Sequence, residues 1–201
     1  MQPAELTELM RRIEHAFLYD MPGVTEVWLV RHGDCYEGLT ELEDPPLSPL
    51  GHRQAHRLAA RIQAAGITSI YSSPSQRARQ TAEVLNSDVK LDDRLREMEN
   101  NPGEAAKFVL NPQQSYTEPP EQVVARMAAA IDEAVAAHPG ERIALVTHGV
   151  ALLAYVGSLL RIEFGNLRLF PYYTSVTVVR ALGERRMVGS LVDAAHLEGG
   201  T

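Results

Sequence analysis

Two histidines of this chain directly follow runs of apolar residues. Residues 27–33 read V-W-L-V-R-H-G, and residues 143–149 read I-A-L-V-T-H-G. Short, valine-containing apolar runs of this kind are typical of strands that are buried on both faces. His32 and His148 are therefore predicted at the carboxyl ends of two strands, which is the edge at which open α/β sheets bind their ligands.

Two arginines and a carboxylate are expected near the same edge. Arg31 directly precedes the first of these histidines, and Arg77 lies in the first turn of a helix that is predicted to follow the strand 67–71. Arg79 lies about 200° further around that helix, so it cannot share a target with Arg77. Glu97 follows a further short strand and supplies the carboxylate.

These residue types suit phosphoryl chemistry. A planar guanidinium gives two parallel hydrogen bonds to phosphate oxygens, and a neutral imidazole beside it can act as a nucleophile. Cys35 does not indicate a cysteine phosphatase, because the sequence C-Y-E-G-L-T-E lacks the arginine that such a phosphate-binding loop needs. His52 and His56 have the spacing of a metal-binding pair, but no nearby carboxylate completes a site. We therefore predict neither a metal nor another cofactor.

Strands and helices alternate over most of the chain. This alternation predicts an α/β fold, a three-layer sandwich with a central, mostly parallel sheet flanked by helices. Two helix starts are recognisable, one at Ser48 and Pro49 and one at Ser73 and Pro74. The other predicted elements are strands at residues 67–71, 89–91, 142–147, 174–180 and 186–192, and helices at residues 120–137 and 150–160.

Residues 1–22 are predicted to add an amphipathic helix to a single domain that covers residues 23–201. Acidic residues interrupt this segment too often for a signal sequence. Its apolar residues follow helical spacing; they are Leu6, Leu9, Met10, Ile13 and Phe17. We expect the helix to pack on the core, and a contact in a homodimer is the alternative.

The composition limits the class of partner. The 201 residues carry a net charge of -7, which argues against a general nucleic-acid or membrane-surface binder. A small phosphate monoester would have to be attracted by local arginines. The single cysteine excludes an internal disulfide and suits a reducing compartment, so a cytoplasmic location is expected.

In their order along the chain, these segments resemble the histidine phosphatase superfamily, which includes the cofactor-dependent phosphoglycerate mutases. The resemblance covers residues 24–196. R-H-G at residues 31–33 resembles the family's nucleophile motif, and P-L-S-P-L-G-H-R-Q-A at residues 46–55 resembles the helix start after it. S-S-P-S-Q-R-A-R-Q-T-A resembles the second arginine motif, with Arg77 in the family's position, and V-T-H-G resembles the second histidine motif.

The resemblance implies a phosphoglycerate mutase-like fold and a metal-independent phosphomonoester hydrolase, a histidine acid-type phosphatase that acts through a phosphohistidine on a small phosphorylated metabolite. In this mechanism His32 attacks phosphorus, and Glu97 protonates the leaving alkoxide and later takes a proton from water. The residues implied to bind the phosphate are Arg31, Arg77, His148 and Gly149.

Departures from the mutase pattern favour hydrolysis. Cys35 and Gly38 stand where the mutases have a hydroxyl residue and an asparagine, and E-N-N-P-G-E replaces F-G-x-W-E-G after the catalytic carboxylate. The chain is also short for the lid segments of the mutases. A phosphoglycerate mutase is the first alternative, and a non-catalytic phospholigand-binding member of the fold is the second.

An acidic segment follows the first histidine, and it is expected to form either a solvated loop or the rim of the pocket. Its members are Asp34, Glu37, Glu41, Glu43 and Asp44. At the rim, their field would disfavour bisphosphates and favour monoesters with neutral or cationic leaving groups. Specificity is expected to lie in the segments 34–46 and 98–119.

Overall fold

A computed structural model of the chain describes residues 3–35, 44–98 and 116–198. Its centre is a six-stranded sheet with the strand order β3-β2-β4-β1-β5-β6. The strands are β1 (Thr25–Arg31), β2 (Ser69–Ser72), β3 (Val89–Leu91), β4 (Arg142–Thr147), β5 (Val176–Leu182) and β6 (Arg185–Asp193). Strands β1 to β4 run parallel, and β5 and β6 run antiparallel to their neighbours. The predicted mostly parallel sheet is confirmed.

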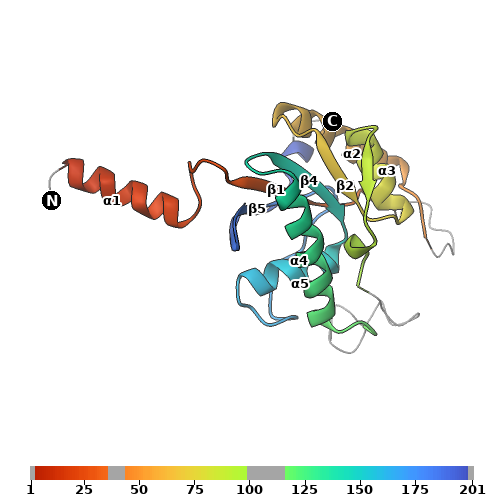
Figure 1. Ribbon diagram of the computed structural model, residues 1–201. Coiled ribbons are helices and arrows are strands. Elements are labelled where there is room, and N and C mark those ends of the chain that lie inside the picture. Colours follow the sequence, from red (N-terminus) through yellow and green to blue (C-terminus); the bar gives the residue numbers. More distant parts are fainter. Residues whose placement is uncertain (1–2, 36–43, 99–115, 199–201) are drawn as a thin grey trace.

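Helices cover both faces of this sheet (Figure 1). The α-helices are α1 (Pro3–Ala16), α2 (Pro49–Ala64), α3 (Gln76–Leu85), α4 (Pro120–Ala137) and α5 (Gly149–Leu159), and 3-10 helices occur at Asp93–Leu95 and Ala195–Leu197. Val27 and Leu29 of β1 pack with α4 and α5 on one face, whereas Val30 packs with α2 and α3 on the other. The central strands are thus buried on both faces, which explains their apolar runs.

The helix starts are partly as expected. Pro49 is the first residue of α2, and the Ser48 hydroxyl accepts a hydrogen bond from the backbone N–H of Gly51 at 3.0 Å. In contrast, α3 begins at Gln76 and not at Pro74. The Ser73 hydroxyl accepts from the Ser75 N–H at 3.3 Å and contacts Nε2 of His148 at 2.9 Å, so Ser73 holds the turn before the helix against the His148 ring.

The expected packing of the N-terminal helix on the core is not seen. The large apolar residues of α1 are between 43% and 47% exposed, and Phe17, which follows the helix, is 58% exposed; those of the helix are Leu6, Leu9, Met10 and Ile13. The end of the helix is fixed instead, because Arg185 donates to its last two carbonyls at 3.3 and 2.8 Å and the following Leu18 is buried. These contacts direct α1 away from the sheet (Figure 1). Within the described ranges, no helix combines the length and the apolar character that crossing a membrane requires.

Candidate active site

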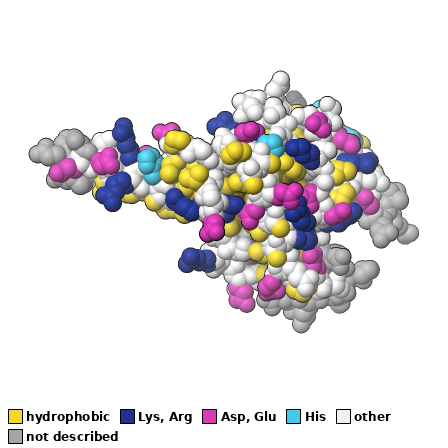
Figure 2. Space-filling view, in the orientation of Figure 1, with side chains coloured by type: hydrophobic (Ala, Val, Ile, Leu, Met, Phe, Trp, Pro, Cys, Tyr) yellow, Lys and Arg dark blue, Asp and Glu magenta, His cyan; other side chains and the backbone are white. Residues whose placement is uncertain are grey.

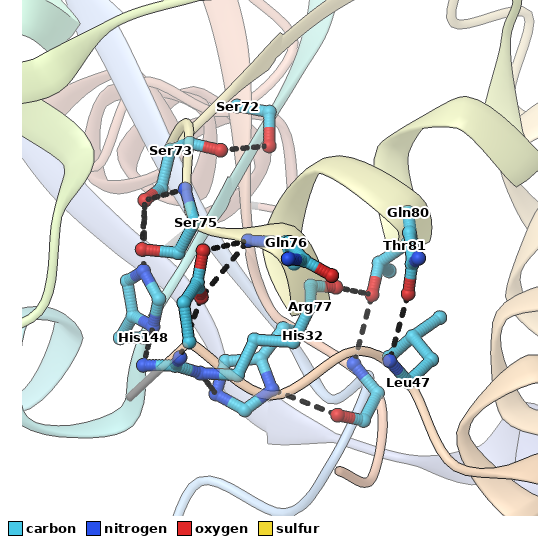
Figure 3. Close-up of polar contacts among 12 residues, drawn as sticks. His32, Leu47, Ser72, Ser73, Ser75, Gln76, Arg77, Gln80, Thr81 and His148 are labelled. Carbon is cyan, nitrogen blue, oxygen red and sulfur yellow. Dashed lines mark hydrogen bonds and ion pairs between the residues drawn. The ribbon is translucent and has the colours of Figure 1, made fainter. Parts of the chain in front are cut away.

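His32 follows β1 at the carboxyl edge of the sheet and is only 3% exposed. Its Nδ1 atom lies 2.7 Å from the carbonyl oxygen of Gly33. Because a carbonyl can only accept, we assign the proton to Nδ1. The Nε2 atom then keeps its lone pair, which accepts a hydrogen bond from Nε of Arg77 at 3.2 Å (Figure 3).

His148 follows β4 and is completely buried at the N-terminus of α5. Its Nδ1 atom lies 3.2 Å from a terminal nitrogen of Arg77, so this ring nitrogen is the acceptor. Its Nε2–H group donates to the Ser73 hydroxyl at 2.9 Å. The centroids of the His32 and His148 rings are 5.1 Å apart, and the Arg77 guanidinium contacts both (Figure 3).

Arg77 is held in this position from its own helix. Thr81, one turn later in α3, accepts a hydrogen bond from the Gly33 N–H at 3.0 Å and donates to the Arg77 carbonyl at 2.7 Å. The remaining guanidinium nitrogen lies 3.5 Å from the carboxylate of Asp44, which also accepts from the backbone N–H of Gln76. Thr81 therefore links the loop that follows His32 to the helix that carries Arg77.

The surroundings keep both imidazoles neutral near pH 7. Burial, followed by the charge of Arg77, lowers the pKa of His32 well below its ordinary value. Burial, followed by the charges of His32 and Arg77, likewise lowers the pKa of His148. A neutral imidazole is the form that can attack phosphorus.

Arg31 is 8% exposed and is clamped by the segment before β5. One terminal nitrogen donates to the Pro171 carbonyl at 2.6 Å, and the guanidinium lies 4.1 Å from the ring centre of Tyr173 and 5.2 Å from that of Phe170. Its Nε finds no hydrogen-bond partner among the described residues. A Cβ atom at Gly149 would lie 3.3 Å from this Nε, so the Arg31 guanidinium packs against the first residue of α5. Such a helix start attracts anions.

Glu97 reaches the same helix start and caps it. Its two carboxylate oxygens accept hydrogen bonds from the backbone N–H groups of Ala151 at 2.8 Å and Val150 at 3.2 Å. A carboxylate at a helix N-terminus is stabilised by the helix dipole. Glu97 thus lies within one turn of His148, and its oxygens satisfy two of the donors of α5.

The backbone around Glu97 is fixed by Arg126 of α4. Its guanidinium donates to the carbonyls of Arg94 and Arg96 at 2.7 Å and to that of Glu97 at 3.2 Å. Glu118 holds Arg126 in turn with two hydrogen bonds of 2.7 and 2.9 Å. Arg126 therefore positions the segment that carries the carboxylate.

The structure brings the predicted site residues to one edge of the sheet; they are Arg31, His32, Arg77, Glu97 and His148. Arg79 is turned away, as expected, and pairs with Glu83 at 3.4 Å. Asp34 was expected either in a solvated loop or at the rim of the pocket. It is buried, because Ser48 donates to its carboxylate and Gln54 accepts from its N–H. The residues of the acidic segment that lie outside the described ranges are Glu37, Glu41 and Glu43.

Several residues of the site were not identified from the sequence. Thr81 could have been found, because it lies four residues after Arg77 and so on the same face of the helix. Tyr173 and Arg126 carry no comparable signal, since each reaches the site from a distant part of the chain.

Comparisons with known proteins identify the family of the chain. Residues 27–194 match the family model of the histidine phosphatase superfamily (branch 1). A probable phosphoglycerate mutase GpmB of Yersinia enterocolitica is 32% identical, and the match covers 86% of this chain and 95% of that protein.

Solved structures have the same fold. YhfR of Bacillus stearothermophilus superimposes with a TM-score of 0.73 at 28% identity, over 87% of this chain and all of that chain. A mycobacterial glucosyl-3-phosphoglycerate phosphatase superimposes with a TM-score of 0.69 at 22% identity, over 83% of this chain and 98% of that chain. The second likeness concerns the fold alone. Since the family model spans most of the sequence and includes both histidines, the chain belongs to the histidine phosphatase superfamily, in its branch 1.

Proposed function

We propose that this protein is a metal-independent phosphomonoester hydrolase in which His32 is the nucleophile. The lone pair of Nε2 attacks phosphorus and the bond to the leaving oxygen breaks, which gives a phosphohistidine and an alcohol. Water then attacks the phosphohistidine and releases inorganic phosphate. The observation that carries the proposal is the Nδ1–H bond to the Gly33 carbonyl, because it turns the lone pair of a buried, neutral imidazole toward Arg77.

Cationic and backbone donors surround the position where the phosphate would bind. Arg31, Arg77 and His148 are assigned to the three non-bridging oxygens, and the N–H of Gly149 adds a fourth donor. Two guanidinium groups beside the nucleophile suit an anion and disfavour a metal cation. His148 would donate from Nδ1 once the phosphate dianion supplies the negative charge that favours its protonation.

Glu97 is assigned as the general acid for the leaving oxygen and then as the base for water. Its place beside the start of α5, within one turn of His148, supports this role. The two α5 N–H groups hold the carboxylate in one orientation. Oε1 accepts a second hydrogen bond from the Met98 N–H at 2.9 Å, so Oε2 is the oxygen with a lone pair left for the proton.

The test is release of inorganic phosphate from p-nitrophenyl phosphate with EDTA present, for the wild type, His32→Ala and the exposed-residue control His52→Ala. Turnover that survives EDTA, persists in the control and is lost in His32→Ala is expected. An acid-labile phosphoenzyme should also be trapped by rapid quenching of the wild type only. Loss of turnover with EDTA, or its retention in His32→Ala, would contradict the proposal.

A phosphoglycerate mutase is the second candidate, because the curated relatives at 32% identity are named probable phosphoglycerate mutase. Cys35 and Gly38 in place of the expected hydroxyl and amide weigh against it. The two activities separate in one assay with 3-phosphoglycerate. A hydrolase releases inorganic phosphate, whereas a mutase produces 2-phosphoglycerate and conserves the phosphate ester.

We also propose a preference for singly phosphorylated substrates with neutral or cationic leaving groups. The acidic residue that supports it is Asp44. Its carboxylate lies 3.5 Å from Arg77, where it would repel a second anionic group. A panel of monoesters tests this. Sugar bisphosphates should be the poorest substrates, and Asp44→Asn should narrow the difference.

A further inference from the structure

The N-terminal helix carries an apolar face that nothing in the described structure covers. Leu6, Leu9, Met10 and Ile13 lie on one side of α1, each more than 40% exposed. The helix also lies outside the residues that match the family model, 27–194, so the catalytic domain does not account for it. Figure 2 shows α1 standing clear of the rest of the molecule.

The contacts at the end of α1 prevent its apolar face from packing against the core of the same chain. Arg185 caps the last carbonyls of the helix, Leu18 is buried, and the Arg180 guanidinium lies 4.0 Å from the ring centre of Tyr19. These contacts fix both the end of the helix and its direction. An isolated helix of 14 residues is only marginally stable in water. Its stability therefore calls for a second molecule.

The charges beside the apolar face indicate which molecule binds there. At 100° per residue, Glu5 and Arg12 lie on the same flank of the face, seven residues and therefore about 10 Å apart along the axis. When two copies of the helix meet in antiparallel orientation, this flank meets its own copy. Glu5 of each chain then lies opposite Arg12 of the other. We propose that α1 pairs antiparallel with α1 of a second copy of this chain, through Leu6, Leu9, Met10 and Ile13.

The size of this contact predicts a reversible dimer. A pair of short helices buries less than the ~1,200 Å² at the lower end of stable interfaces. The apolar contact supplies the affinity, and the exposed ion pairs fix the orientation. We expect dissociation in the micromolar range.

Sedimentation equilibrium of the full chain between 1 and 100 µM tests the dimer. The wild type should dimerise, and Leu9→Glu should raise the dissociation constant at least about a hundredfold, because each dimer loses two buried leucines. His15→Glu adds the same charge on the opposite face and should dimerise like the wild type. A monomeric wild type would overturn the proposal, as would equal weakening by both substitutions. Circular dichroism shows whether α1 stays helical in each variant.

Charge reversal tests the antiparallel orientation without disturbing the apolar face. Glu5→Arg alone and Arg12→Glu alone each place like charges opposite one another and should weaken the dimer on the order of tenfold. The double reversal should restore the affinity of the wild type. A dimer that is insensitive to the single reversals would overturn the orientation. If the wild type stays monomeric but binds anionic vesicles, the proposed dimer is overturned and the apolar face of α1 binds a membrane surface instead.

Discussion

Arg77 donates from Nε to the Nε2 atom of His32 across 3.2 Å, so a phosphate-binding candidate occupies the lone pair of the nucleophile. A phosphate dianion accepts a stronger hydrogen bond from a guanidinium than a neutral imidazole does. Substrate binding would therefore exchange one acceptor for another and free the lone pair for attack. Arg77 links phosphate binding to activation of the nucleophile.

Replacing Arg77 by alanine tests both parts of this link. The kcat/KM for phosphate release should fall about 10²- to 10³-fold, as expected when one preorganised donor is lost. The acidic limb of the pH profile should also move to higher pH, because the charge of Arg77 helps to lower the pKa of His32. Arg79→Ala is the matched control, since Arg79 lies outside the site and pairs with Glu83. A loss smaller than about tenfold would remove Arg77 from the phosphate site.

The two buried histidines make the stability of the fold depend on pH. Their pKa values lie well below the 6.5 of an ordinary histidine, so below pH 6.5 the unfolded chain binds protons that the folded chain does not. The contribution of these two histidines to the free energy of unfolding is therefore fully present above pH 6.5 and is lost as the pH decreases below this value. Urea midpoints should drop between pH 7 and 5, and the drop should be smaller in His148→Gln than in the control His52→Gln. Midpoints that are constant over this range would contradict the prediction.

The aromatic clamp on Arg31 should control phosphate affinity. Tyr173→Ala removes the ring that lies 4.1 Å from the guanidinium, so the inhibition constant of inorganic phosphate should rise about tenfold, the size of a partly buried cation–π contact. Tyr173→Phe keeps the ring and should stay close to the wild type. If both variants lose affinity equally, the hydroxyl and not the ring is responsible.

Arg126 should affect the step in which the leaving group takes a proton. Arg126→Gln loosens the segment that carries Glu97, so kcat should fall about tenfold on alkyl phosphates, whose leaving oxygen needs a proton. On p-nitrophenyl phosphate, whose leaving group needs none, the loss should be much smaller. A merely structural defect would lower both rates in the same proportion. Glu118→Gln should act in the same direction, because Glu118 holds Arg126.

Residues at strand ends and helix boundaries were predictable because local physics decides them. The predicted strand at residues 142–147 and the predicted helix at residues 120–137 have the boundaries found in the structure. A proline opens that helix, and Pro139 and Gly140 follow its end. The parallel pairing of β1 with β4 then brings His32 and His148 together.

Contacts between distant segments were not predictable in this way. Arg126 reaches the Glu97 segment across 29 residues, and Arg31 reaches Pro171 across 140. Neither side chain differs in type from an exposed arginine elsewhere in the chain, such as Arg79. The amphipathic pattern of α1 showed that one face needs a partner, but not which surface supplies it.

The pairing of β1 with β4 joins residues 116 positions apart, such as Glu26 and Arg142. Closing so long a loop costs entropy before any contact compensates for it, so this pairing forms slowly. His32 also leaves the ribosome long before His148 is made. A nascent chain can thus complete the catalytic edge only after β4 and His148 have been made, and the recovery of enzymatic activity during refolding should follow the formation of this one strand pair.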